Sequence, residues 1–253
     1  MMKLFIVANW KMNPLTLKEA EGILLSVKKE TRKNREVEVV ICPPFIYLPL
    51  LLKKSALAVG AQDCFWLESG AYTGEISALM LKKLGCQYVI IGHSERRTNF
   101  GETDEVVNKK LKAALAAELN PIVCLGGTEN ERKEERIAVV IKKQIEAAFK
   151  DIPVNQLSSS RISIAYEPVW AIGTNNPCGI EESRVARLLI EKTLEETLET
   201  KTFKNLRLLY GGSVNKENAK DYIGKAGFVG LLVGGASLKP EFVEIIRDCS
   251  HLS

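Results

Sequence analysis

Short apolar runs alternate with amphipathic stretches along the whole chain. Eight of these runs are nearly continuous in aliphatic residues and do not alternate with polar ones. They begin near Lys3, Glu36, Leu57, Gln87, Pro121, Arg161, Leu206 and Phe228. Continuous apolar runs are typical of parallel strands that are buried on both faces. The pattern therefore predicts eight buried parallel strands.

Helical periodicity fills the intervals between these runs. The clearest helical patterns cover residues 16–31, 103–118, 129–149, 181–198, 215–223 and 239–249, and shorter ones cover residues 44–54 and 77–84. Thr103 precedes acidic residues at one predicted helix start, and Gly85 follows the end of another helix, as capping residues do. Eight strand–helix pairs within 253 residues predict an α/β fold, a single-domain (β/α)₈ barrel spanning residues 1–253.

An open doubly wound sheet is the alternative arrangement of alternating strands and helices. It would place a G-x-G-x-x-G turn after an early strand. The segment "ANWKMNP" that follows the first apolar run contains no such turn. The barrel is therefore favoured.

Composition and charge narrow the class of protein. The net charge of +4, from 35 basic and 31 acidic residues, suits attraction of small anions and is too weak to indicate nucleic-acid binding. The apolar run from Leu4 to Ala8 is too short for a signal-peptide core or a membrane span, and no other run reaches that length. Six scattered cysteines form no C-x-x-C pair and no zinc spacing, as in reduced proteins. We therefore expect a cytoplasmic protein with no nucleic-acid or membrane partner.

Polar residues and glycines gather at the carboxyl ends of the predicted strands, where barrel enzymes carry their chemistry. In a closed barrel these ends surround one mouth, so residues far apart in the sequence converge. The residues are Asn9 and Lys11 after the first strand, His93 and Glu95 after the fourth, Glu167 after the sixth, Gly211, Gly212 and Ser213 after the seventh, and Gly234, Gly235 and Ser237 after the eighth.

The two glycine pairs after the last two strands indicate a phosphate site. Glycine lets the backbone approach a ligand closely and direct N–H groups at it. A short helix starting near Ala236 would add its own N-terminal N–H groups. Phosphate sites recur at this place in barrel enzymes. We therefore expect a phosphorylated small molecule as the ligand.

One carboxylate, one imidazole and one ammonium facing such a ligand suit proton abstraction next to a carbonyl group. Glu167 would accept the proton, His93 would donate to the carbonyl oxygen, and Lys11 would offset the developing charge. Because Glu167 stands alone among neighbours of other kinds, no metal is expected. A Schiff base on Lys11, as in an aldolase, is the chemical alternative. A binding protein without catalysis would be expected to lack one of these three residues.

Six motifs, in order and over essentially the whole chain, make the sequence resemble the triosephosphate isomerase family. They are "ANWKMN" at residues 8–13, "GAYTGEIS" at 70–77, "IIGHSERR" at 90–97, "AYEPVWAIGT" at 165–174, "YGGSV" at 210–214 and "LVGGASL" at 232–238. The resemblance implies a glycolytic and gluconeogenic aldose–ketose isomerase. It would interconvert dihydroxyacetone phosphate and D-glyceraldehyde 3-phosphate through an enediolate, without a metal or an organic cofactor.

The resemblance also implies a role for each site residue. Glu167 corresponds to the base and His93 to a neutral electrophile, while Asn9 and Lys11 position the substrate and Glu95 supports this group. The backbone N–H groups of four residues are implied to bind phosphate: Gly173, Ser213, Gly234 and Gly235.

The family is usually a homodimer or a larger assembly, and its third barrel loop inserts into the partner. Here that loop covers residues 62–77, with Thr73 at the tip, and Thr73 and Glu75 are expected at the interface. The aromatic residues Phe65, Trp66 and Tyr72 in this loop predict an exposed apolar patch on a monomer.

Two segments depart from the family pattern. Gly127 in "CLGGT" replaces an acid that many members have, which removes local support expected for this loop. The segment 168–174 resembles the family's mobile lid, but the lid ends in "NNPC" at residues 175–178, where family lids often have "GKTA". Pro177 would restrict a hinge position. We therefore expect altered rates of lid opening with the chemistry intact.

Overall fold

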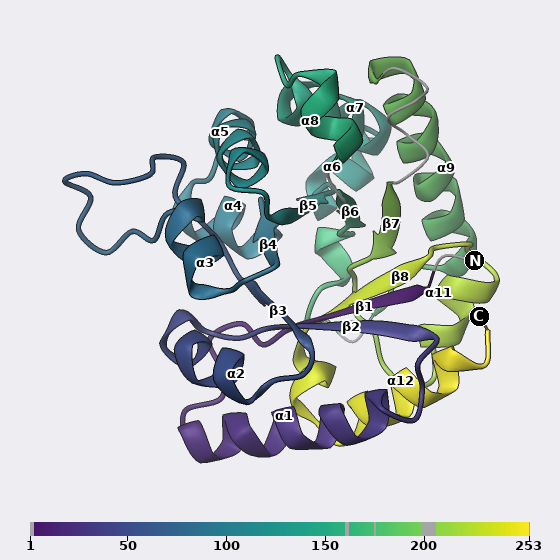
Figure 1. Ribbon diagram of the computed structural model, residues 1–253. Coiled ribbons are helices and arrows are strands. Elements are labelled where there is room, and N and C mark those ends of the chain that lie inside the picture. The colour runs from purple at the N-terminus through teal and green to yellow at the C-terminus, as the bar shows by residue number, and fades with distance from the viewer. Residues whose placement is uncertain (1–2, 160–161, 175, 199–205, 253) are drawn as a thin grey trace.

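Eight parallel strands pair in chain order, and the first also pairs with the last, so that the sheet closes into a barrel (Figure 1). The computed structural model describes residues 3–159, 162–174, 176–198 and 206–252. The strands are β1 (Leu4–Asn9), β2 (Val37–Cys42), β3 (Ala58–Ala61), β4 (Tyr88–Ile91), β5 (Asn120–Leu125), β6 (Ser163–Tyr166), β7 (Arg207–Tyr210) and β8 (Gly230–Val233). The closed pairing confirms the predicted (β/α)₈ barrel and excludes the open sheet. The predicted start of the sixth strand at Arg161 lies outside the described residues.

Helices surround the barrel on its outer side (Figure 1). Thr103 caps α5 by accepting the Val106 N–H, and Gly85 ends α3 with φ 113°, as predicted. No helix within the described ranges is both long and apolar enough to span a membrane. The helices are α1 (Leu17–Thr31), α2 (Leu48–Lys54), α3 (Ala78–Leu84), α4 (Ser94–Phe100), α5 (Asp104–Ala116), α6 (Glu129–Lys133), α7 (Ile137–Phe149), α8 (Val154–Ser159), α9 (Ile180–Thr197), α11 (Ala219–Gly224) and α12 (Glu241–Ser250), with 3₁₀ turns η1 (Phe45–Tyr47), η2 (Val169–Ala171) and η3 (Gly235–Leu238).

Two helix predictions were wrong in extent. The pattern over residues 129–149 is two helices, because α6 buries none of its residues and Glu135 then takes a left-handed φ of 55°. A stretch with no apolar face is not held in line with the core-facing helix that follows it. The pattern over 215–223 becomes helical only at α11, because the Asn215 side chain accepts the N–H groups of Glu217 and Asn218 in a preceding turn.

Apolar side chains fill both sides of the barrel wall. One cluster, including Phe5, Tyr88 and Leu209, comes entirely from the strands and fills the interior. A larger cluster packs the outer faces of the strands against the surrounding helices. Burial on both sides explains why the strands are continuous apolar runs in the sequence. It also makes the barrel a rigid frame for the side chains at its mouth.

The loop over residues 62–77, between β3 and α3, extends away from the barrel (Figure 1). Residues 67–75 of this loop are all exposed, including Thr73 and Glu75. A bridge between Phe65 and Ser77 closes the base of the loop. The loop therefore presents a long surface that the chain itself does not cover.

The aromatic residues of this loop are only partly exposed. The Phe65 ring packs at a tilt against Trp66 and Tyr72, with ring centroids 4.0 and 4.7 Å apart, and Phe65 is itself buried. Tyr72 is 46% exposed and Trp66 is intermediate. The prediction of an exposed patch made by all three rings was therefore wrong for Phe65. This ring stiffens the loop from within.

A group of four charged side chains, three of them buried and Arg96 partly exposed, joins the base of this loop to α4 and α5. Lys110 Nζ lies 2.7 Å from Asp63 Oδ1 and 2.9 Å from Glu102 Oε2, and Arg96 Nε lies 2.9 and 2.8 Å from the same two carboxylates. Burial raises the pKa of Asp63. Burial also opposes ionisation of Glu102, but the Lys110 ammonium outweighs it and lowers the pKa of that carboxyl. Two buried carboxylates thus depend on two cations.

Replacing Lys110 with Ala is expected to lower the free energy of unfolding by about 3 kcal/mol, because it leaves the buried Asp63 and Glu102 carboxylates undercompensated. Urea denaturation followed by circular dichroism measures the change. Lys143→Ala, at an exposed position on α7, is the matched control and should change the value by less than about 0.5 kcal/mol. Equal effects of the two substitutions would show that the buried group does not stabilise the fold.

Candidate active site

A cavity of about 470 Å³ lies at the mouth of the barrel. Seven of the nine predicted catalytic and phosphate-binding residues line it, contributed by the ends of four different strands and by the segment after Glu167. They are Asn9, Lys11, His93, Gly173, Ser213, Gly234 and Gly235. Glu167 and Glu95 do not line this cavity, but both contact residues that do. The structure therefore brings all nine predicted residues into one site.

Glu167 directly follows β6, and its N–H donates to Leu125 O at 2.8 Å, which continues the pairing with β5. Pro168 then ends the strand because it has no N–H to donate. Gly126 lies against this backbone, and a Cβ there would come 1.9 Å from Glu167 O, so only glycine fits. Backbone contacts therefore fix the position of the Glu167 main chain.

The Glu167 carboxylate is buried, with 1% of the residue exposed. Its Oε2 accepts the Ser94 N–H at 2.8 Å, at the N-terminus of α4. Its Oε1 lies 3.0 Å from His93 Nε2. A helix N-terminus stabilises negative charge, and a backbone N–H offsets part of the cost of burying it. The Ser94 N–H therefore holds the carboxylate in place beside the imidazole.

His93 is the N-cap residue of α4, and its Nδ1 accepts the Glu95 N–H at 3.2 Å. This hydrogen bond needs a lone pair on Nδ1, so the proton of the neutral ring lies on Nε2, the atom that faces Glu167. Burial lowers the pKa of His93, but the Glu167 carboxylate outweighs it and raises the pKa above its ordinary value. The protonation of His93 therefore depends on where the Glu167 carboxylate lies.

Lys11 has a positive φ of 54°, which is uncommon for a residue with a side chain. Its N–H donates to Asn9 Oδ1 at 3.0 Å, and the Gln62 amide donates to its carbonyl oxygen at 2.8 Å. Its Nζ lies 2.6 Å from Glu95 Oε1. These contacts fix the backbone and the ammonium group of Lys11 at the cavity. Asn9 and Glu95 therefore position Lys11.

Backbone groups of three segments also line the cavity, close to the Lys11 side chain. The turn η3 begins at Gly235, and the first N–H groups of a helical turn have no acceptor within it. Gly173 contributes from the segment after η2, with a φ of 71°, and Ser213 contributes from the segment after β7. Such N–H groups bind anions, particularly with an ammonium group nearby. This wall can therefore hold a phosphate group.

The segment that follows Glu167 is anchored at both ends. Val169 N–H donates to Gly127 O at 3.1 Å at its start, and Cys178 O accepts the Tyr222 hydroxyl at 2.7 Å at its end. Pro177 is exposed and Cys178 is buried, while Asn175 of the predicted hinge lies outside the described residues. The prediction of altered lid rates stays a prediction.

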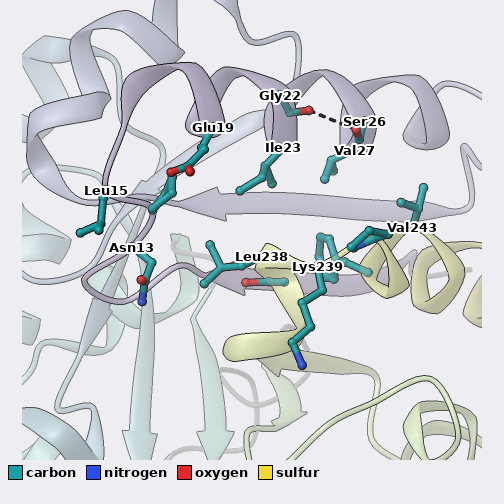
Figure 2. A pocket seen from close by; sticks show the side chains of 14 residues that line it. Asn13, Leu15, Glu19, Gly22, Ile23, Ser26, Val27, Leu238, Lys239 and Val243 are labelled. Carbon is teal, nitrogen blue, oxygen red and sulfur yellow. Dashed lines mark hydrogen bonds between the residues drawn. The ribbon is translucent and has the colours of Figure 1, made fainter.

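A second cavity of about 650 Å³ lies outside the barrel, between α1 and the segment from η3 to α12. Figure 2 shows Ile23 and Val27 extending from α1 toward the segment that carries Leu238 and Val243. Its walls are mainly apolar and do not bring a carboxylate, an imidazole and an ammonium group together. This outer cavity is larger than the one at the barrel mouth, but it lacks the groups that a reaction needs. The candidate active site is therefore the cavity at the barrel mouth.

Two contributors to the site were not predicted from the sequence. Ser94 supplies its backbone N–H to Glu167, and Gln62 holds the backbone of Lys11. Ser94 lies within the predicted "GHSE" motif, but its contribution comes from the main chain, which any residue type could supply. Gln62 carries no sequence signal, because its role depends on the turn that Lys11 makes.

Comparisons with known proteins agree on one family. The family model for triosephosphate isomerase matches residues 4–249. A triosephosphate isomerase of Dehalococcoides mccartyi is 47% identical over 254 residues, covering 99% of this chain and 98% of that protein. The corresponding enzyme of Dictyoglomus turgidum is 43% identical over 252 residues, with 98% and 100% covered. That of Aquifex aeolicus is 42% identical over 249 residues, with 97% and 99% covered.

Replacing Glu167 with Gln is expected to lower the pKa of His93, because it removes the carboxylate that stabilises the imidazolium. The ring should then stay neutral to a lower pH than in the wild-type chain. Titration of the imidazole nitrogen shifts by NMR measures this change, and the pKa of exposed His251 should stay constant as the internal control. An unchanged or higher pKa of His93 would contradict the coupling.

Proposed function

The chain belongs to the triosephosphate isomerase family, and from that premise we propose how its own residues carry the reaction. The enzyme interconverts dihydroxyacetone phosphate and D-glyceraldehyde 3-phosphate, an aldose–ketose isomerisation. The proposal depends chiefly on one observation. A buried carboxylate touches an imidazole that lines the same cavity as an ammonium group and a wall of backbone N–H groups.

The phosphate group of the substrate binds the backbone wall. Gly173, Ser213, Gly234 and Gly235 offer N–H groups, and the Lys11 ammonium lies beside Gly234, where a Cβ would come 3.5 Å from its Nζ. Because backbone N–H groups are fixed by the barrel, they bind without the entropy cost of ordering long side chains. The phosphate thereby positions the three-carbon part of the substrate beside His93 and Glu167.

Glu167 is the base that moves a proton between the two carbons. It removes a proton from C1 of dihydroxyacetone phosphate, which gives an enediolate, and the O1 hydroxyl proton moves to O2. Return of the first proton to C2 then gives the aldehyde. The Nε2–H of neutral His93 donates to the oxygen on which charge develops. Because Glu167 stays against His93 in the free enzyme, its carboxylate must leave the ring before both groups can face the substrate.

Lys11 offsets the negative charge of the enediolate and phosphate, and Asn9 and Glu95 position it. A Schiff base would require a neutral amine as nucleophile. The Lys11 ammonium is ion-paired with Glu95 at 2.6 Å, which favours its electrostatic role over the aldolase alternative.

The segment 168–174 acts as a lid over the bound substrate. It follows the base directly and carries Gly173, which lines the phosphate wall. Closing it would exclude water, strengthen the electrostatic interactions and protect the enediolate from losing its phosphate group. Closure would also be coupled to movement of Glu167, because Pro168 and η2 connect the two without a break.

The enzyme functions as a homodimer in the cytoplasm. Exposed apolar side chains in the segments that follow β1, β2 and β4 support a dimer: Met12 at 89%, Leu15 at 88%, Ile46 at 78% and Phe100 at 71% exposure. The extended loop 62–77, with Thr73 and Glu75, lies between these segments in chain order. Apolar patches on such segments favour association with a second copy. All six cysteines are unpaired and buried, which suits a reducing compartment.

Replacing Glu167 with Asp retracts the base by about one carbon–carbon bond and is expected to lower kcat about 10²-fold or more, with little change in stability. A coupled assay with glyceraldehyde 3-phosphate measures the rate. Glu195→Asp, at an exposed position on α9, is the matched control and should keep full activity. Near wild-type turnover of the Glu167 variant would rule out Glu167 as the base.

Replacing Ile46 with Glu is expected to weaken the dimer at least tenfold, because it places a charge in a buried apolar interface. Analytical ultracentrifugation over a concentration series measures the dissociation constant. Val139→Glu on α7, where the side chain is 65% exposed, is the matched control and should remain dimeric. A wild-type chain that is monomeric at micromolar concentration would overturn the proposal.

A further inference from the structure

Gly127 lies next to the start of the lid but has no side chain that could support it. Its carbonyl oxygen accepts the Val169 N–H, so the main chain here touches the lid directly. A Cβ on Gly127 would come 2.5 Å from Ile137 Cδ1. No side chain fits at this position unless Ile137 moves. An acid at 127 would displace the end of the Ile137 side chain, and Gly127 itself offers the lid only a backbone contact.

Arg132, on α6, occupies the place where such support is needed. Its guanidinium carbon lies 5.0 Å from the centroid of the Trp170 ring, within the range of a cation–π interaction. Its Nε and Nη2 lie 2.8 and 3.1 Å from Glu182 Oε1 and Oε2, in a bidentate pair. Such a pair fixes the plane of the guanidinium as well as its position. Glu182 thus holds the group that covers Trp170.

The pair also links the two ends of the lid segment. Trp170 belongs to η2, which begins two residues after Glu167, whereas Glu182 lies near the start of α9, four residues after Cys178. Burial and the neighbouring Glu182 carboxylate raise the pKa of the Cys178 thiol to about 12, so this end of the lid stays uncharged. The Arg132–Glu182 pair therefore contacts the lid near its first hinge, at Trp170, and the chain beyond its second hinge, at the start of α9.

We propose that Arg132 is a positioning residue for the isomerisation, acting through Trp170 on the turn that carries Glu167. This inference depends on the proposed role of Glu167 as base. The planar guanidinium restrains Trp170, Trp170 restrains η2, and η2 is joined through Pro168 to the base. Loosening Trp170 would misplace the carboxylate while the phosphate wall stays intact, so turnover falls and substrate affinity does not.

Replacing Arg132 with Gln is expected to lower kcat about tenfold and to change KM less than about twofold, because positioning is lost and phosphate binding is kept. Glu182→Gln, which frees the guanidinium, should act in the same direction. Arg136→Gln is the matched control, because Arg136 lies three residues after α6 and pairs with Glu134. It should keep wild-type constants.

A double-mutant cycle tests whether Arg132 acts through Trp170. In a Trp170→Leu background, Arg132→Gln should cause no further loss, because the contact is already gone. ¹⁹F NMR of 5-fluorotryptophan-labelled chain should show Arg132→Gln shifting the Trp170 signal and leaving the Trp10 and Trp66 signals in place, which also reports an intact fold.

An equal loss of kcat from Arg132→Gln in both backgrounds would overturn the proposal, as would an unshifted Trp170 signal or an unchanged kcat. If Arg132→Gln fails to fold, Glu182→Gln replaces it in the same double-mutant cycle, and the same outcomes support or overturn the proposal. A separate result tests the role of Glu167 as base. If Glu167 is not the base, the Glu167→Asp variant should have normal turnover, independently of the outcome of the double-mutant cycle.

Discussion

Glu167 carries a carboxylate into a position where 1% of the residue is exposed, and the barrel mouth is organised around compensating that charge. Burying an ionised carboxylate is costly unless hydrogen bonds or opposite charge replace water. The compensation comes from β4 and α4, which supply the Ser94 N–H at 2.8 Å and the His93 imidazole at 3.0 Å. The ends of β4 and β6 lie on either side of β5 at the barrel mouth, which brings these groups to Glu167. The rigidity of the strands is therefore a condition for the site.

The same compensation creates a resting state that the reaction must leave. While Glu167 faces His93, its carboxylate raises the pKa of the ring and keeps the base away from a bound substrate. Binding of the phosphate by the backbone wall and closure of the segment 168–174 must supply the free energy for this exchange of partners. Glu167, Pro168 and η2 are continuous in the chain, so movement of the lid and movement of the base are one event.

The barrel could be predicted well from the sequence because each strand has its own local pattern, and that pattern repeats eight times along the chain. Each buried strand is a continuous apolar run, and site residues follow these runs directly. Contacts between side chains could be predicted less well. Ser94 acts through its main chain, Gln62 acts through the turn at Lys11, and Phe65 is buried by its own loop. Arg132 resembles any charged residue on a surface helix until Trp170 and Glu182 are placed beside it.

The central claim is that Glu167 exchanges Ser94 and His93 for the substrate. A crystal structure of the chain with 2-phosphoglycolate, a phosphorylated two-carbon acid that mimics the charge of the enediolate, tests this most directly. In that structure, Glu167 Oε2 is expected to move out of hydrogen-bond reach of the Ser94 N–H, now 2.8 Å away, and to contact the ligand. The phosphate is expected on the N–H groups of Gly173, Ser213 and Gly235. A bound ligand with the Ser94 contact still in place would contradict the claim.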